Sequence, residues 1–394
     1  MSVRKLKKDI YAVGSIDWDR ELFDALIPLS EGTSYNSYLI IGSEKTALID
    51  TVDPSKEQDL LDNLKKLNVS KIDYVISNHA EQDHSGTIPK ILEHYPEAQV
   101  VTNRRCKEFL MDLLLVKEEK FRTVEDRETL SLGNKTLQFI LTPWVHWPET
   151  MVTYLKEDRI LFSCDFFGSH FATSDLFVKD NNKVYDPAKI YYAEIMMPFR
   201  AVIIKNLQKL EDFEFEMIAP SHGPVYKDTD FIIKTYKDWV SDSVKNEVVV
   251  PYISMHGSTS TMINYFLNSL IEKGVTVTPF NISQTDIGKL SMALVDAATV
   301  VIGSPTVLAA AHPTIIYAVS LVNALKPKFK FASVIGSYSW KGKMLEQIKD
   351  NLSNLKFELL PPVIAKGHPK DVDFKELDRL VNDIVDRHKS INLM

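Results

Sequence analysis

The chain has 394 residues, of which 45% are hydrophobic and 25% are charged; this is ordinary for a folded soluble protein, and the length allows two or three domains. A net charge of −7 gives no support to a nucleic-acid partner, and no apolar run approaches the ~18 residues of a membrane span. Only two cysteines occur, Cys106 and Cys164, which excludes a disulfide framework, a rubredoxin-type module and a ferredoxin-type cluster, so we expect a cytoplasmic protein whose metals are bound mainly by nitrogen and oxygen.

Short β-branched runs dominate the chain as far as about residue 165, and turn signals such as Gly42-Ser43 bound several of them. Helical periodicity intervenes at 55–67 and 87–94. We expect two β-rich sheets flanked by helices, with strands at 10–13, 37–41, 46–49, 74–77, 99–102, 137–141, 151–155 and 160–163.

From residue 246 the pattern becomes a regular alternation of strand and helix, which is typical of a doubly wound parallel sheet. The expected strands are 248–253, 275–280, 299–302, 331–335 and 357–363, and the expected helices are 261–273, 286–297, 314–325, 341–354 and 373–389. Residues 230–244 are expected to be the last helix of the first domain. The sequence therefore predicts a metal-binding domain at 1–245 and a second domain at 246–394.

A dense group of ionisable residues follows the expected strand 74–77, in the run His79-Ala80-Glu81-Gln82-Asp83-His84. We expect this run to be a loop, because a loop can point alternate side chains at two neighbouring metal centres. Taken singly, a histidine is usually a satisfied structural group and an aspartate at a strand end is usually a cap; His94, His368 and His388 are interpreted in that way. Four possible ligands in six positions are costly to bury unless a cation compensates them. The candidate metal ligands are His79, Glu81, Asp83, His84, His146, Asp165 and His222.

Three segments of the second domain, each at the carboxyl end of an expected strand, resemble a phosphate and ring-binding site. Hydroxyls and free N–H groups at a helix start favour a phosphate, although most such turns are only helix caps. No Gly-x-Gly-x-x-Gly and no Walker lysine are present, so a monophosphate is favoured over a dinucleotide. The candidate residues are Ser254, Met255, His256, Gly257, Ser258 and Thr259, then Ser304, Pro305, Thr306 and Val307, then Ser337, Tyr338, Ser339 and Trp340.

The run from His79 resembles the H-x-[EH]-x-D-H signature of the metallo-β-lactamase superfamily. Glu81, where the zinc hydrolases of that superfamily carry a second histidine, is similar to the flavodiiron proteins. The resemblance extends over nearly the whole chain and implies an α/β protein, with a metallo-β-lactamase-like αββα sandwich followed by a flavodoxin-like doubly wound sheet. It also implies a ligand set: one iron held by His79, Glu81 and His146, another by Asp83, His84 and His222, and Asp165 bridging the two.

This resemblance further implies an oxidoreductase that reduces O2 to water, NO to N2O, or both, with FMN and two non-haem irons in each subunit. His170 and one of Tyr191 and Tyr192 resemble pocket residues of the family, with ordinary packing as the alternative. The implied electron donor is rubredoxin or a reduced 5-deazaflavin coenzyme, and the implied assembly is a head-to-tail homodimer, with a tetramer also open. Two departures, at 307–312 and at Ser339 in place of a common glycine, bear on the flavin potential.

Two other functions fit parts of the sequence. One is a metallo-β-lactamase-type zinc hydrolase with an appended flavodoxin domain; Glu81 argues against it, because a second histidine would be expected there. The other is a non-enzymatic electron carrier whose first domain is vestigial; the complete ligand set argues against it, because a decayed site would have lost residues.

Overall fold

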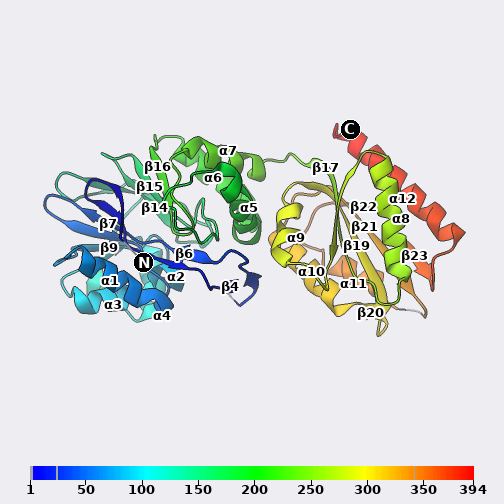
Figure 1. Ribbon diagram of the computed structural model, residues 1–394, viewed down its shortest axis with the longest axis horizontal. Coiled ribbons are helices and arrows are strands. Elements are labelled where there is room, and N and C mark those ends of the chain that lie inside the picture. Colours follow the sequence, from blue (N-terminus) through cyan, green and yellow to red (C-terminus); the bar gives the residue numbers. More distant parts are fainter. Residues whose placement is uncertain (1–2, 24, 341) are drawn as a thin grey trace. The chain divides into compact units, whose positions relative to one another are not determined.

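Two units, each with its own sheets and core, make up the computed structural model, which describes residues 3–23, 25–340 and 342–394 (Figure 1). The first unit comprises Met1–Tyr192 and Phe199–Val240, and the second comprises Ala193–Pro198 and Ser241–Met394. Over the described residues, none of the helices combines the length and the apolar character needed to cross a membrane.

The first unit contains two sheets that face each other across a shared apolar core. Residues of both sheets, such as Ile49 and Val101 of one and Phe139 and Phe162 of the other, are fully buried between them. The seven-stranded sheet has the order β1 (Arg4–Lys7), β2 (Ile10–Ala12), β7 (Tyr38–Ile41), β8 (Thr46–Ile49), β9 (Tyr74–Ile76), β10 (Gln99–Thr102) and β11 (Phe121–Thr123). The five-stranded sheet has the order β12 (Thr129–Ser131), β13 (Thr136–Leu141), β14 (Met151–Leu155), β15 (Ile160–Cys164) and β16 (Met217–Pro220).

Helices cover the outer faces of these sheets (Figure 1). Leu60, Ile91 and Leu110 belong to helices that pack against the first sheet and form a second apolar core there. The helices are α1 (Glu57–Lys66), α2 (Gln82–Ser85), α3 (Ile88–His94), α4 (Arg104–Leu114), α5 (Asn181–Tyr191), α6 (Arg200–Leu210) and α7 (Thr229–Val240). Two short antiparallel pairs lie outside the main sheets: β3 (Ser15–Asp17) with β6 (Thr33–Tyr35), and β4 (Leu22–Phe23) with β5 (Ile27–Pro28).

The second unit is a parallel sheet with helices on both faces, as predicted (Figure 1). The strand order places the first strand between the second and the third, which is the flavodoxin order. The strands, in that order, are β18 (Thr276–Asn281), β17 (Lys245–Tyr252), β19 (Ala297–Val307), β21 (Phe331–Tyr338), and β22 (Glu358–Leu359) with β23 (Val363–Lys366) as two pieces at the edge; β20 (Ala310–Ala311) pairs antiparallel with β19.

Each face of this sheet has a separate apolar core. Phe266 and Leu380 represent the core under the first pair of helices, and Leu290, Ile315 and Ile348 represent the core under the other three. The first pair is α8 (Ser258–Glu272) and α12 (Asp371–Ser390), and the other three are α9 (Ile287–Leu294), α10 (Pro313–Leu325) and α11 (Met344–Asp350).

The structure differs from the sequence prediction at three places in the second unit. The expected strand 357–363 is split into β22 and β23, because Pro361 and Pro362 have no N–H to donate to a neighbouring strand. The expected helix 341–354 is shorter, and its first residue, Lys341, lies outside the described residues. The segments predicted as loops after the third and fourth strands continue as β19 and β21, since they remain paired with each other as far as Pro305 and Ser337.

Candidate metal centre and phosphate site

The candidate metal ligands of the first unit come from the ends of four strands. His79 follows β9, His146 lies between β13 and β14, Asp165 follows β15, and His222 follows β16. Because these strands belong to two facing sheets, segments far apart in the sequence meet at one edge of the sandwich. Four of these side chains are at most 1% exposed: His79, His84, Asp165 and His222. Ionisable groups are therefore buried at this edge of the sandwich.

Three side chains form the first group of ligands: His79, Glu81 and His146. Nε2 of His79 lies 3.1 Å from Oε2 of Glu81, and Nε2 of His146 lies 3.0 Å from the same oxygen. Both nitrogens also face Oδ2 of Asp165, at 3.6 Å from His79 and 3.5 Å from His146. The four side chains offer atoms within 4.8 Å of one another, which allows them to share one metal ion.

Asp83, His84 and His222 form the second group. Nε2 of His222 lies 3.1 Å from Oδ2 of Asp83, and Nε2 of His84 lies 3.3 Å from Oδ1. Both nitrogens face the other oxygen of Asp165, Oδ1, at 2.8 Å from His84 and 3.4 Å from His222. The two oxygens of Asp165 are therefore divided between two groups of side chains.

The run that carries the first four ligands is not a loop throughout, as the sequence analysis expected. Residues Gln82–Ser85 form the one-turn helix α2, which begins directly after Glu81. The structure shows why a helical turn is compatible with the site: Asp83 and His84 are neighbours on the turn and join the same group, while Glu81 before the turn joins the other. The change of backbone direction at the start of α2 separates the two groups.

Charges within the centre compensate one another. Burial lowers the pKa of His222, but its ion pairs with Asp165 and Asp83 outweigh burial and raise that pKa to about 10. In the same way, ion pairs with Asp165 and Glu81 outweigh burial at His146, and its pKa rises to about 9. Without a metal the histidines thus hold protons beside the carboxylates, and a metal ion would replace those protons.

Several polar atoms of the centre are incompletely satisfied. In the described part of the chain, no hydrogen bond of ordinary geometry reaches either carboxylate oxygen of Asp83, either ring nitrogen of His84 or Oδ2 of Asp165. The oxygens of Asp83, Oδ2 of Asp165 and Nε2 of His84 face other side chains only at ion-pair distances. Buried polar atoms without hydrogen bonds are costly, and one or two cations at this position would satisfy them.

The structure also groups Cys164 with His84 and Asp165 as a possible ligand set. Cys164 is buried, and burial, with Asp50 and Asp165 nearby, raises the pKa of its thiol well above the usual value. A thiol that keeps its proton is a poor metal ligand. Nitrogen and oxygen atoms therefore remain the main donors of the centre.

Tyr191 and Tyr192, which the sequence did not separate, lie in different places. The hydroxyl of Tyr191 donates to Oδ1 of Asp165 at 2.9 Å, whereas that of Tyr192 bonds to the carbonyl of Trp239 at 3.4 Å. Gly168 makes room for Tyr191, since a Cβ there would lie 3.0 Å from the tyrosine ring. Tyr191 is thus the tyrosine at the metal centre.

His170 lies beside this tyrosine. Its ring centroid is 4.9 Å from that of Tyr191 and 5.1 Å from that of His222. Its Nδ1 bonds to Oγ1 of Thr33 at 2.9 Å, while Nε2 has no hydrogen-bond partner among the described residues. Burial, reinforced by the charge on His222, holds the pKa of His170 well below its usual value, so the ring is neutral at neutral pH.

Sequence reasoning missed the side chains that support the ligands. Nδ1 of His79 bonds to Oε1 of Glu149 at 2.7 Å, and Nδ1 of His222 bonds to the carbonyl of Ser34 at 2.7 Å. Asp50 accepts two hydrogen bonds from the residue before His79. The sequence contains no signal for these roles, because Glu149, Ser34 and Asp50 lie far along the chain from the ligands that they support.

The phosphate site of the second unit lies where β17, β19 and β21 end. The cavity there has a volume of about 130 Å³, which suits the phosphate-bearing end of a mononucleotide. Gly257, with φ of +88°, precedes the first turn of the 15-residue helix α8, whose N–H groups favour an anion. The cavity is lined by Ser254, Met255, His256, Ser258, Thr259, Pro305, Thr306, Ser337, Tyr338, Ser339 and Gly367.

Four of the predicted flavin residues do not line this cavity: Gly257, Ser304, Val307 and Trp340. The hydroxyl of Ser304 is turned toward the backbone, where it donates to the Pro305 carbonyl and accepts from the His312 N–H. Trp340 is 67% exposed. After Val307 the chain turns through two residues of positive φ and returns as β20.

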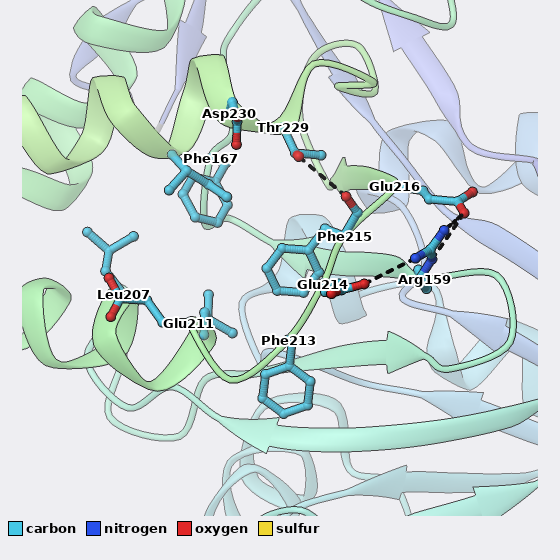
Figure 2. Close-up of a pocket in the computed structure, with 12 residues that line it drawn as sticks. Arg159, Phe167, Leu207, Glu211, Phe213, Glu214, Phe215, Glu216, Thr229 and Asp230 are labelled. Carbon is cyan, nitrogen blue, oxygen red and sulfur yellow. Dashed lines mark hydrogen bonds and ion pairs between the residues drawn. The ribbon is translucent and has the colours of Figure 1, made fainter.

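A larger cavity of about 420 Å³ lies elsewhere in the first unit (Figure 2). Its walls are largely apolar, and at one end Arg159 pairs with Glu214 and Glu216. The lining residues are Arg159, Phe167, Leu207, Leu210, Glu211, Phe213, Glu214, Phe215, Glu216, Thr229, Asp230 and Ile233. None of the candidate metal ligands lines it, so size alone does not locate the chemistry of this protein.

Known proteins resemble this chain over nearly its full length. A family described as "ODP family beta lactamase" matches residues 33–223. A nitric oxide reductase from Moorella thermoacetica is 33% identical over 387 residues, which covers 96% of this chain and 97% of that protein.

Solved structures agree with this. The rubredoxin oxygen:oxidoreductase from the anaerobe Desulfovibrio gigas has a TM-score of 0.95 at 28% identity and covers 98% of this chain and 99% of its own. The flavodiiron protein from Giardia intestinalis has a TM-score of 0.90 at 27% identity, covering 99% and 97%. The predicted fold, a metallo-β-lactamase-like sandwich with a flavodoxin-like sheet, is confirmed. With a relative above 30% identity spanning both units, the chain belongs to the flavodiiron protein family.

Proposed function

We propose that this chain is an oxidoreductase that reduces O2 to water, NO to N2O, or both, at a non-haem diiron centre supplied with electrons by FMN. The observation that carries the proposal is the Asp165 carboxylate, whose Oδ2 faces one group of ligands and whose Oδ1 faces another. A carboxylate between two groups suits a pair of cations, and two cations can bind a small substrate between them.

The residues present fit iron. Four imidazoles and three carboxylates would hold two ions: His79, Glu81 and His146 on one side, Asp83, His84 and His222 on the other, with Asp165 shared. Imidazole and carboxylate donors suit iron, and zinc has no redox chemistry. A zinc hydrolase is therefore not favoured, and the relatives named for nitric oxide or oxygen reduction support this choice.

The second unit fits FMN. Its cavity combines hydroxyls, free N–H groups at the start of α8 and no lysine of a nucleotide triphosphate site. When bound, FMN would supply electrons one at a time, and the irons would bind and reduce the diatomic substrate. We assign residues 1–245 to the metal-binding domain and 246–394 to the flavin-binding domain.

Two side chains beside the centre can handle protons. Burial and the nearby Asp165 carboxylate raise the pKa of Tyr191 well above its usual value, so its hydroxyl keeps its proton at neutral pH and points it at Asp165. His170 is neutral and next to Tyr191, with its Nε2 available. We infer that Tyr191 holds a proton beside the shared Asp165 carboxylate, and that the neutral ring of His170 relays a proton to it by releasing one from Nε2 as Nδ1 takes one up from the side of Thr33.

The remaining parts of the proposal concern partners. We infer an external electron donor, either rubredoxin or a reduced 5-deazaflavin coenzyme; the relative named rubredoxin oxygen:oxidoreductase supports the first. We also infer a cytoplasmic protein that assembles as a head-to-tail homodimer or as a tetramer, so that the flavin of one subunit serves the metals of the other. The charge of −7 offers no support to a nucleic-acid partner.

The deciding experiment mixes anaerobically reduced, iron-loaded protein with O2, and in a second run with NO, while the flavin absorbance is followed. Fast reoxidation by O2 with almost no peroxide, or fast reoxidation by NO with release of N2O, is the expected result. Slow reoxidation with stoichiometric peroxide and no N2O would mean that the flavin reacts alone, and the proposal would be wrong.

The hydrolase alternative has its own test. Metal analysis of protein purified from cells grown with both metals should show two irons per chain; two zinc ions and no iron would establish a hydrolase. A Glu81→His variant sharpens this, because it introduces the histidine that zinc hydrolases carry. We expect that variant to lose iron and oxidase activity, and retention of both would contradict our interpretation of Glu81.

A further inference from the structure

Glu149 makes a hydrogen bond to a candidate metal ligand from outside the ligand set. Its Oε1 accepts from Nδ1 of His79 at 2.7 Å and from the N–H of Ala80 at 3.1 Å. The side chains of Glu149 and His79 are both 0% exposed. The bond occupies the ring nitrogen of His79 that faces away from the centre, which leaves Nε2 directed toward Glu81 and Asp165.

Glu149 is itself held by a part of the chain that provides no ligands. Its carbonyl accepts a 2.6 Å hydrogen bond from Nδ2 of Asn103. Oδ1 of Asn103 in turn accepts from the N–H groups of Arg105 and Cys106, which caps the start of α4. The backbone at Glu149 is therefore tied to the start of α4, and the carboxylate reaches His79 from this anchored position.

The second group of ligands has no equivalent. Nδ1 of His222 bonds to a neutral carbonyl, that of Ser34. Within the described residues, no carboxylate reaches the outer ring nitrogen of His84, His146 or His222. The two halves of the centre use similar ligands. They thus differ in the groups that bond to the outer ring nitrogens of their histidines.

We propose that Glu149 is a positioning residue that makes the two metal positions unequal. Glu149 fixes the tautomer of His79 and makes its Nε2 a stronger electron-pair donor to a metal. This tightens the binding of the metal held by His79, Glu81 and His146, and it stabilises the ferric form of that ion. The metal bound by Asp83, His84 and His222 receives no such support. This role presupposes two bound irons, so the inference rests on the proposed function.

Two substitutions separate orientation from charge. Glu149→Gln keeps an oxygen that can accept from both His79 and Ala80 but removes the negative charge. Glu149→Ala removes both. A matched control is Asp73→Asn, because Asp73 is also a buried carboxylate that accepts a backbone hydrogen bond, from Thr46, but makes no bond to a ligand histidine.

The experiment loads each protein with ⁵⁷Fe, challenges it with an iron chelator, counts the irons retained, and records Mössbauer spectra during a redox titration. In Glu149→Ala we expect about 10- to 100-fold weaker binding of one iron of the two. In Glu149→Gln we expect both irons to remain, with one spectral component changed and reduced at a higher potential. The Asp73→Asn control should show neither one-sided effect.

Three results would overturn the proposal. They are an equal change in both irons, no change in either Glu149 variant, or the same one-sided change in Asp73→Asn. Because Glu149→Ala could fail to fold, the spectra and potentials of Glu149→Gln suffice to decide. If wild-type protein binds two irons and reduces its substrate while Glu149→Gln is indistinguishable from it, only the role of Glu149 fails; if wild-type protein does neither, the proposed function itself fails.

Discussion

The metal centre of the first unit and the phosphate site of the second are built from different parts of the chain. The centre consists of seven ionisable side chains brought from four strand ends, and most are fully buried. The phosphate site consists of strand ends, small hydroxyls and the first turn of one helix, and its lining residue Met255 is 50% exposed. Single side chains should therefore matter much more in the first site than in the second.

The two sites also differ in the charge that they bury. The metal centre places carboxylates and imidazoles out of reach of water, so each charge must be matched by another or by a metal. The phosphate site presents mostly backbone and hydroxyl dipoles, which remain hydrated in the absence of a ligand. The side chains of the metal centre are thus a coupled set, in which each depends on the others for metal binding. In the phosphate site, each group adds a modest amount to the affinity for the ligand independently of the others.

The largest effect is expected from Asp165→Ala, which removes the carboxylate shared by both ligand groups. Because each group would lose a donor, we expect loss of both irons and at least about a 100-fold loss of O2 or NO reduction. Iron analysis and the rapid-mixing assay measure this. Asp212→Ala, at an exposed residue paired with Arg127, is the control; an Asp165→Ala protein that retained two irons would refute the coupled-set view.

The next largest effect is expected from Tyr191→Phe, with the adjacent Tyr192→Phe as its control. Tyr191→Phe removes a hydrogen bond to the Asp165 carboxylate, whereas Tyr192→Phe removes one to a carbonyl outside the centre. A hydrogen bond to a charged group is worth about 1.5–3 kcal/mol, so we expect turnover to fall about 10- to 100-fold in the first variant. Iron content should stay at two per chain in both. Equal turnover in the two variants would remove Tyr191 from the proton-handling role.

In the second unit a single hydroxyl should matter less. Thr259 lines the phosphate cavity and bonds to Ser337 at 3.1 Å, and we expect Thr259→Val to weaken FMN binding about 10-fold. Thr261→Val is the matched control, because Thr261 only bonds back to the Gly257 carbonyl. Quenching of FMN fluorescence by the flavin-free protein gives both affinities. A complete loss of FMN in Thr259→Val would show that this site, too, depends on one side chain.

The smallest effect tests a histidine outside both sites. His388 is buried between Thr299 and Asn246, and burial lowers its pKa to about 4. Since the unfolded chain takes up that proton near pH 6.5 and the folded chain does so only near pH 4, the free energy of unfolding should fall as pH drops through this range, by about 0.7 kcal/mol between pH 7 and 6. Urea unfolding should show a weaker pH dependence for His388→Gln. An unchanged dependence would mean that other groups control the acid stability of the second unit.

Most strands of the main sheets follow from the sequence because their β-branched runs are local signals, and β8, β10 and β14 begin and end where the pattern predicts. Strands β1, β11, β12 and β16 were not predicted. Helices α4, α5 and α6 were not predicted. Helix α5 contains Pro187, which conceals its periodicity, and tertiary packing overrides such a weak local signal. The antiparallel pairs β3–β6 and β4–β5 were also missed, since two- or three-residue strands carry too little pattern.

By itself the sequence determined which residue types are available: a ligand run with Glu81 in place of a histidine, three strand-end segments rich in hydroxyls, and the order that resembles the flavodiiron proteins. Only the tertiary structure decided that Asp165 faces two groups, that Tyr191 rather than Tyr192 reaches it, and that Glu149 stands behind His79. The reason is physical. Residue types and short-range periodicity are written along the chain, whereas contacts between residues as far as 188 positions apart (Ser34 and His222) depend on how two sheets pack face to face.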